Sequence, residues 1–457
     1  MIQISKLSSK TPLMPLNSRL LTIWLFLTFS YCSVPIQENV DWPVYLGDAH
    51  SSQFSTLQQI NRQNVTSLRV AWTYSTGDAS PENRSEIQCN PIIIDGVLYG
   101  SSAASKFFAL NAITGDMLWT FDPLEGDRTH SGRRINRGVA WWGKGNQTRI
   151  LAAISHWLFS IDAKTGKLDP DFGQSGVVDL RKGLETKEIE WNQVFVDART
   201  PGIVFEDLLI IGSRVGEGDR AAPGHVRAFN ILTGKIVWTF HTIPQPGEFG
   251  AETWGPKPSD HNGGANSWAG LSLDKDRGVV YIPTGSATPD FFGGNRKGSN
   301  LFANCILALN ARTGKRLWHF QTVHHDLWDR DLPAPPNLVT VVHQGKTIDA
   351  VAQITKSGHV FLLDRDTGRP LFPVEEKSVP SSDVHGEEAF PTQPIPTAPP
   401  PFSRQSFTPT NLSDQANKEV RNAVSKLRKD GIFAPPSTRG TLVYPGFDGG
   451  GEWGGAA

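Results

Sequence analysis

The segment ALNARTGKRLW, residues 308–318, decides the fold, because variants of it return along the whole chain. Each variant has a short apolar strand, then Asp or Asn, two further residues, Thr-Gly and, in most copies, an aromatic residue a few positions later. The copies centre on Asn111-Thr114-Gly115, Asp162-Thr165-Gly166, Asn230-Thr233-Gly234, Asn310-Thr313-Gly314 and Asp364-Thr367-Gly368. The Asp or Asn side chain caps a tight turn, and glycine supplies its positive φ. The pattern predicts repeated strand-turn-strand units with tryptophans between neighbouring sheets.

Strand-like runs between these turns favour an all-β fold. Three of them, rich in β-branched residues, are 91–99, 202–212 and 278–283. Helical periodicity is nearly absent, and the exception at about 413–430 predicts one surface helix with a serine cap. A Pro-rich stretch at about 380–403 predicts an extended excursion rather than a domain. The repeated units together predict a β-propeller of four-stranded sheets.

Composition narrows the class of protein. A chain of 457 residues is long enough for two or three domains, but a propeller uses such a length as one domain. The net charge is −1 and no basic stripe is present, so nucleic acid is not an expected partner. Three cysteines are too few for a disulfide framework, and without a Cys-x-x-Cys-His motif no covalently attached haem is encoded.

The N-terminus has the proportions of a targeting segment. Basic residues precede an apolar run from Leu20 to Phe29, which is too short to span a bilayer comfortably. We therefore expect residues 1–34 to be a signal peptide or an N-terminal anchor, and residues 35–457 to form the propeller. Cys32 leaves lipid attachment open as an alternative. The expected location is the periplasm, with possible membrane association through this segment.

A polar cluster, QTVHHDLWDRDL at residues 321–332, directly follows the repeated segment quoted first. It concentrates three acids, two histidines and a tryptophan. One interpretation is a solvated loop, because acids are common in loops. The other is a repeat protein in which one repeat carries chemistry, with the acids and histidines of this cluster, Asp329, Asp326 and His325 among them, as candidates.

Six segments, in the same order, resemble the pyrroloquinoline quinone (PQQ)-dependent alcohol and sugar dehydrogenases, and most of all their glucose/quinate-type branch. They are residues 87–91, 136–142, 265–269, 288–296, 324–329 and 446–455. The resemblance implies an eight-bladed propeller with PQQ on its axis, of which this chain covers about six blades. It also implies that further blades follow in the family, so we expect the chain alone to be poorly soluble and catalytically silent.

The resemblance also implies roles for individual residues. Trp268 would form the floor under the flat quinone, and Arg137 would bind one of its carboxylates. Gln88 and Glu452 would contact the cofactor edge. Lys356 would contact the quinone oxygens and stabilise charge there, and Asp329 would be the catalytic base.

The resemblance also implies a metal ion, held in this chain by Glu217 and Asp329. Glu217 stands where alcohol-oxidising members of the family place a carboxylate on the metal. We expect calcium or magnesium, with a lanthanide less favoured. Ser286 stands where those members use an asparagine ligand, so the set of ligands stays open. Asp331 stands where lanthanide-using members carry an extra carboxylate, but sugar-type members also have an acid there.

The substrate class implied is a sugar or an alcohol, with ubiquinone or a separate cytochrome as electron acceptor. Glucose itself is in doubt because Arg133 occupies the position of a histidine in the glucose enzymes. Two alternatives remain open. One is a non-enzymatic propeller scaffold of the outer-membrane assembly lipoprotein kind, and the other is an inactive truncated remnant.

Overall fold

The computed structural model describes residues 40–457 except 83, 126–127, 129–133, 187–188 and 256–261. The predicted targeting segment, residues 1–34, and Arg133 both lie outside the described residues. Within these ranges, no helix combines the length and apolar character that crossing a membrane requires.

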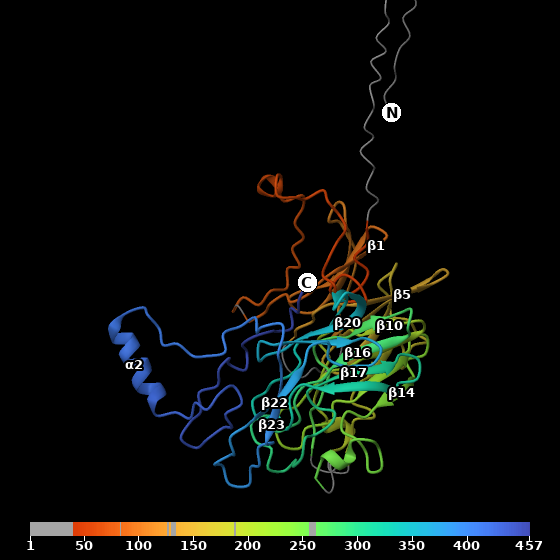
Figure 1. Cartoon of the computed structure of the whole chain (residues 1–457). Coiled ribbons are helices and arrows are strands. Elements are labelled where there is room, and N and C mark those ends of the chain that lie inside the picture. Colours follow the sequence, from red (N-terminus) through yellow and green to blue (C-terminus); the bar gives the residue numbers. More distant parts are fainter. Residues whose placement is uncertain (1–39, 83, 126–127, 129–133, 187–188, 256–261) are drawn as a thin grey trace, which may run out of the picture. The chain divides into compact units, whose positions relative to one another are not determined.

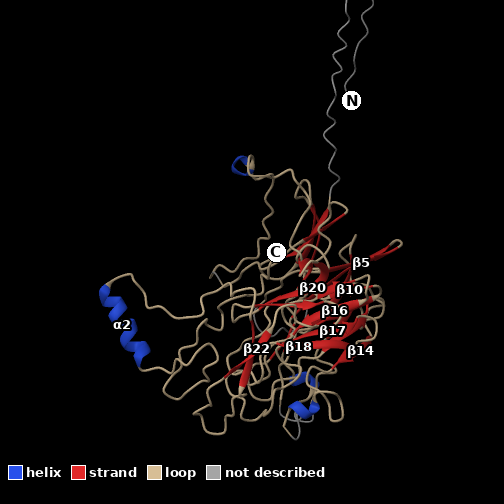
Figure 2. Ribbon diagram, in the orientation of Figure 1, coloured by secondary structure: helices blue, strands red, loops and turns tan. Residues whose placement is uncertain are grey.

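Four antiparallel sheets of four strands each form most of the fold, and in each sheet the strands pair in chain order (Figure 2). The first two sheets contain β1 (Ile92–Ile94), β2 (Val97–Ser101), β3 (Phe107–Asn111), β4 (Met117–Phe121), β5 (Ala140–Lys144), β6 (Gln147–Ile154), β7 (Trp157–Asp162) and β8 (Val177–Asp179). The next two contain β10 (Ile203–Phe205), β11 (Leu208–Ile211), β13 (Val226–Asn230), β14 (Ile236–Phe240), β15 (Ser272–Asp274), β16 (Val279–Pro283), β17 (Cys305–Asn310) and β18 (Arg316–Gln321). A fifth sheet has three strands, β19 (Asn337–His343), β20 (Lys346–Ile354) and β21 (Val360–Asp364).

The repeated turn has the predicted geometry. Asn310 Oδ1 accepts hydrogen bonds from the backbone N–H groups of Arg312 and Thr313, at 3.1 and 3.0 Å. Gly314 has a φ of +71°, which favours glycine. The turn therefore closes through the side chain of its first residue and reverses through the glycine.

Three of the five repeated turns also support a tryptophan from the preceding sheet. Trp238, in β14, donates its indole N–H to the carbonyl of Ala311 at 3.1 Å. A Cβ on Gly314 would lie 2.6 Å from the Trp238 ring, so only glycine allows this contact. Trp119 meets Gly166, and Trp318 meets Gly368, in the same way. The predicted tryptophans between sheets are thus confirmed.

Neighbouring sheets meet through their first strands. β5 contacts β10, β10 contacts β15, and β15 contacts β19. The space between the second and third sheets is filled by a cluster that includes Leu151 and Leu209, and a similar cluster joins the third and fourth. This is the arrangement of a β-propeller, and the all-β prediction with four-stranded sheets is confirmed (Figure 1).

The Pro-rich region contains more regular structure than an extended excursion. β22 (Val374–Ser378) pairs with β23 (Thr392–Pro396), and the second strand lies within the stretch 380–403. Prolines are tolerated there because this two-stranded sheet consists of edges only.

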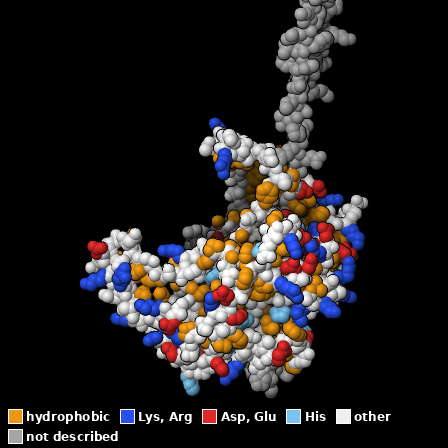
Figure 3. All heavy atoms as spheres, in the orientation of Figure 1, with side chains coloured by type: hydrophobic (Ala, Val, Ile, Leu, Met, Phe, Trp, Pro, Cys, Tyr) orange, Lys and Arg blue, Asp and Glu red, His pale blue; other side chains and the backbone are white. Residues whose placement is uncertain are grey.

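The surface helix is shorter than the predicted span 413–430. α2 (Asp414–Ser425) is capped at its N-terminus by Ser413, whose hydroxyl accepts from the Ala416 N–H at 3.1 Å, and the helix has no buried residue. It ends early because Arg428 is buried and donates to the Ser381 carbonyl at 2.7 Å, a contact the helical path does not provide. α2 stands away from the sheets in Figure 1. Acidic and basic side chains are intermixed with apolar ones over the face in Figure 3.

The described residues also contain several short elements. They are η1 (Val65–Ser67), η2 (Trp191–Gln193), η3 (Ala251–Thr253) and the paired strands β9 (Val196–Asp197) and β12 (Arg214–Val215).

Candidate active site

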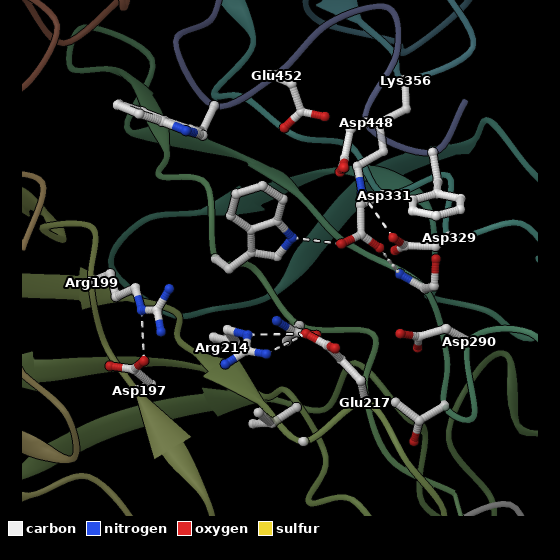
Figure 4. A pocket seen from close by; sticks show the side chains of 18 of the residues that line it. Asp197, Arg199, Arg214, Glu217, Asp290, Asp329, Asp331, Lys356, Asp448 and Glu452 are labelled. Carbon is white, nitrogen blue, oxygen red and sulfur yellow. Dashed lines mark hydrogen bonds and ion pairs between the residues drawn. The ribbon is translucent and has the colours of Figure 1, made fainter. Parts of the chain in front are cut away.

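A cavity of about 430 Å³ gathers most of the residues selected from the sequence (Figure 4). The predicted residues that line it are Arg137, Glu217, Trp268, Asp329, Lys356 and Glu452. These positions are far apart in the chain, so the cavity exists only because the sheets bring their connecting segments to one place.

Gln88 does not line the cavity. Its Oε1 accepts from Arg137 Nε at 3.2 Å, and its amide group donates to Glu86 at 2.9 Å. The side chain thus supports Arg137 instead of facing the cavity, since a buried guanidinium needs acceptors for its N–H groups.

Arg137 is buried and lies between two aromatic rings. Its guanidinium carbon is 5.3 Å from the Trp268 ring and 4.6 Å from the Trp453 ring, which are cation–π distances. Its Nη1 donates to Thr200 Oγ1 at 3.2 Å. Burial lowers the pKa of Arg137, yet the group stays cationic because a guanidinium does not deprotonate in proteins.

The loop that carries Asp329 is folded around Asp326. The Asp326 carboxylate is buried and accepts from Ser286 Oγ, at 2.5 Å, and from Asn304 Nδ2, at 2.8 Å. It also accepts from the backbone N–H groups of Trp328 and Arg330. Asp326 therefore organises the loop and does not line the cavity.

Two residues of this loop take left-handed backbone conformations. Asp329 has a φ of +54° and His325 a φ of +47°. Such conformations cost energy for residues other than glycine, and they concentrate at functional sites. His325 uses its ring nitrogens on the Gly298 carbonyl and on Glu387, at 2.8 and 3.0 Å. Asp329, in contrast, lines the cavity.

Asp329 forms an ion pair with Lys356. Lys356 Nζ lies 3.2 Å from Asp329 Oδ2, and Lys356 is only 5 % exposed. Burial opposes the charged form of Lys356, but Asp331, Asp329 and Glu452 outweigh it and raise its pKa to about 12. Lys356 is therefore a permanent cation on the cavity wall.

The backbone around this pair is tied together by Arg330. Its guanidinium donates to the carbonyls of Lys356, Gly446 and Pro445, at 3.2, 2.9 and 2.5 Å. These bonds join the Asp329 loop, the turn after β20 and the segment that leads to Glu452. One buried side chain thus holds three parts of the site.

Acids crowd one side of the cavity, and they are labelled in Figure 4. Burial, with the charge of Asp331, raises the pKa of Asp329 to about 8 even though Lys356 opposes the rise. Burial, followed by Asp331 and Asp329, raises the pKa of Asp290 to about 8. Burial also raises the pKa of Glu452, whose buried Oε1 has no hydrogen-bond partner within the described residues. This wall is suited to accept a proton or a cation.

Arginines line another part of the cavity, held by the β9–β12 pair. Arg214 is the register partner of Asp197 in that pair. Arg199 Nε donates to Asp197 Oδ2 at 2.6 Å, and Arg214 Nη2 lies 2.5 Å from Glu217 Oε1. With Arg137, this wall presents three guanidinium groups, which are suited to carboxylates.

The two predicted metal ligands line the same cavity, but each has a cationic partner. Glu217, with an exposed side chain, is paired with Arg214, and Asp329 with Lys356. Among the described residues, no three His, Cys, Asp or Glu side chains are grouped as a metal site requires. Ser286, at the uncertain ligand position, donates its hydroxyl to Asp326.

Several cavity residues were not predicted from the sequence. They are Asp197, Arg199, Arg214, Asp290, Asp448 and Trp453. Trp453 could have been found, since it follows Glu452 in a segment already singled out. Arg199 gave no signal, because it lies in the irregular segment between β9 and β10, whose direction depends on tertiary structure.

Comparison with known proteins gives one family. Residues 42–457 match the family described as PQQ: glucose/ethanol/alcohol dehydrogenase, beta-propeller domain. The chain is 35 % identical over 448 residues to the quinoprotein glucose dehydrogenase of Escherichia coli (strain K12), covering 91 % of this chain and 54 % of that protein. It is 32 % identical to the quinate/shikimate dehydrogenase (quinone) of Acinetobacter baylyi, covering 93 % of this chain and 56 % of that one. The chain thus spans about half the length of these relatives.

A solved structure shares the fold. The quinohemoprotein alcohol dehydrogenase of Comamonas testosteroni is 28 % identical, with a TM-score of 0.62, over 78 % of this chain and 52 % of that chain. A europium-containing methanol dehydrogenase, at 21 % identity and a TM-score of 0.60, supports the fold alone.

Proposed function

Because the chain belongs to the PQQ-dependent glucose/ethanol/alcohol dehydrogenase family, we propose that it oxidises a sugar or alcohol hydroxyl with PQQ bound in the cavity of Trp268 and Asp329. The observation that carries this proposal is the ion pair of Lys356 with a high-pKa Asp329 on the wall of that cavity. A proton acceptor and a fixed cation, side by side, are what oxidation of a hydroxyl requires of the protein.

The residues present fit the cofactor. PQQ is a flat o-quinone with three carboxylates, so it needs an aromatic surface and cationic partners. Trp268 supplies the surface, and Arg137, Arg199 and Arg214 supply the cations. The unpartnered Oε1 of Glu452 adds an acceptor for a polar edge.

The protein side chains would divide the work between them. When bound, PQQ supplies a carbon that accepts hydride, which no side chain offers. Asp329 would take the proton of the substrate hydroxyl, since it is a carboxylate that lines the cavity beside the cation of Lys356. Lys356 would place its ammonium where negative charge develops. Arg137 and Trp268 would orient the ring system.

We propose a metal ion of the calcium or magnesium kind beside the acids, with Glu217 and Asp329 as ligands. Oxygen ligands of this type suit hard divalent cations. Burial, followed by the charges of neighbouring acids, raises the pKa values of Asp290 and Asp329, and this supports the proposal because a bound cation would favour their charged forms. For Glu217 to bind the metal ion, its carboxylate must leave its ion pair with Arg214.

For the substrate, the relatives named for glucose and quinate favour a polyhydroxylated molecule over a simple alcohol. The electron acceptor would be ubiquinone or a separate cytochrome. A periplasmic location, with possible membrane association through residues 1–34, stays part of the proposal.

The test is PQQ binding by the purified protein. PQQ is titrated against wild type, Trp268→Ala and the control Trp191→Ala, and bound cofactor is measured by equilibrium dialysis and absorbance. Trp191 is partly exposed and outside the cavity. Loss of a stacking surface of this kind costs about 1–3 kcal/mol, so we expect about tenfold or more weaker binding for Trp268→Ala only. Equal affinity of all three proteins would contradict the proposed site.

A further inference from the structure

The indole of Trp268 is anchored by a carboxylate. Its Nε1–H donates to Asp331 Oδ2 at 2.7 Å, and Figure 4 draws this bond. A charged acceptor makes this bond stronger than one between neutral groups. An aromatic ring on a loop segment otherwise rotates about its side-chain torsions, so the bond selects one orientation of the ring.

The same carboxylate is itself fixed. Asp331 Oδ1 accepts from the backbone N–H of Ser286 at 2.5 Å. A Cβ on Gly285 would lie 2.6 Å from Asp331 Oδ1, so the glycine makes room for this close approach. Both oxygens of Asp331 therefore contact the protein, one the indole and the other the backbone after β16.

Asp331 has no ion-pair partner within the described ranges. Its charge nevertheless acts on its neighbours, because it raises the pKa values of Asp290, Asp329 and Lys356. An unpaired carboxylate on a cavity wall is costly unless hydrogen bonds satisfy it. Here the bonds to Trp268 and Ser286 do so.

Asp331 is also two residues from the base. Asp329 and Asp331 share one short loop, and Arg330 between them is buried and bonded to three carbonyls. The loop therefore cannot shift Asp329 without moving the acceptor of the indole N–H. The aromatic surface and the base are kept in register by a single stretch of backbone.

We propose that Asp331 is a positioning residue that fixes the plane of Trp268 and, with it, the aromatic surface on which the cofactor would lie. The proposal rests on the proposed function for its consequence, but the bond itself exists without cofactor.

The first experiment observes the bond directly. Protein labelled with ¹⁵N-tryptophan gives one indole N–H resonance per tryptophan, and Trp268→Phe identifies that of Trp268. We expect this resonance to be shifted downfield and to move or broaden in Asp331→Ala, but to stay in place in Asp448→Ala, another acid of the cavity wall. An unchanged resonance in Asp331→Ala would overturn the proposal. That result is the one expected if Asp331 serves only to bind a metal ion.

The second experiment measures coupling through PQQ binding. In the wild-type background, Asp331→Ala should weaken PQQ binding about tenfold. This value is at the lower end of what the loss of a hydrogen bond to a charged group costs, here the bond between Trp268 and Asp331. In the Trp268→Phe background, which has no indole N–H, the same change should have an effect below about threefold. Equal losses in both backgrounds would overturn the positioning role.

Controls separate this inference from others. Asp331→Asn keeps a single acceptor for two donors, so its PQQ affinity should lie between that of wild type and that of Asp331→Ala. This variant replaces Asp331→Ala in both experiments if the alanine variant does not fold. Thermal unfolding checks each variant. If no PQQ binds to the wild type, the proposed function fails, while the indole resonance still tests the bond.

Discussion

Lys356 Nζ lies 3.2 Å from Asp329 Oδ2, and the lysine is nearly completely buried whereas the aspartate retains some exposure on the cavity wall. The pair is asymmetric, because neighbouring acids outweigh burial and keep the lysine charged, whereas burial and the charge of Asp331 favour protonation of the aspartate. Asp329 can therefore change its protonation state while its partner does not.

In a chain that also supplies the further blades expected of the family, Asp329→Asn should lower the turnover of the PQQ-loaded protein by about 10²–10⁴, because asparagine keeps the size but cannot accept the proton. PQQ affinity should change less, since Trp268 and Arg137 remain. Dye reduction with a sugar or polyol gives the rate, and Asp276→Asn, at an exposed turn, is the matched control. Wild-type turnover in the Asp329 variant would remove this residue from the proton-accepting role.

Asp290→Asn should stabilise the metal-free protein at high pH. Asp290 has a native pKa of about 8, above the value of about 3.9 for an unfolded aspartate. Between these values the native state binds the extra proton, so stability falls as the pH rises through this window. The melting temperature of the variant should exceed that of wild type most at pH 9 and least at pH 4. Parallel pH profiles would show that Asp290 is not the group responsible.

A divalent cation should offset the loss of stability that comes from ionising the buried acids of the cavity. At about a hundredfold excess over its Kd, calcium or magnesium would stabilise the native state by about 2.7 kcal/mol. We expect chelation to lower the melting temperature at pH 8 and added ion to restore it, with a smaller response in Glu217→Gln. Glu419→Gln, on the exposed helix α2, is the control. If the ion stabilises all three proteins equally, it binds elsewhere.

Gly314→Ala should destabilise the fold more than Gly345→Ala. Both glycines have positive φ, +71° and +75°, so both substitutions cost about 1–2 kcal/mol of backbone strain. Only at Gly314 would the new Cβ also meet a tryptophan ring, at 2.6 Å, while Gly345 has open space. Overpacking adds about 1–3 kcal/mol, so denaturant midpoints should separate the two variants. Equal midpoints would mean that Trp238 moves aside freely.

Local chemistry explains what the sequence predicted well. The Asn310 turn and its glycine depend on neighbours within five residues, so their geometry could be read directly, and the tryptophans followed from the repeat. The helix end at Ser425 could not, because it depends on Arg428 meeting Ser381 across the fold.

The site was predicted less completely, for a related reason. Motif resemblance placed Trp268 and Asp329 on one cavity, but it could not give side-chain directions. Gln88 turned out to support Arg137 from behind, and Asp331 to hold Trp268. Arg199 reaches the cavity through the pairing of β9 with β12, which short segments do not reveal.

The bonds of Arg330 have a consequence for biosynthesis. This side chain joins the loop of Asp329 to carbonyls of Lys356, Pro445 and Gly446. A ribosome releases Arg137 and Trp268 long before the segment with Glu452 and Trp453, since chains emerge N-terminus first. A cofactor that contacts residues of both the early and the late segment can bind fully only after the two segments have come together in the folded chain. We therefore expect the cofactor to be captured by a finished chain, and not to template its folding.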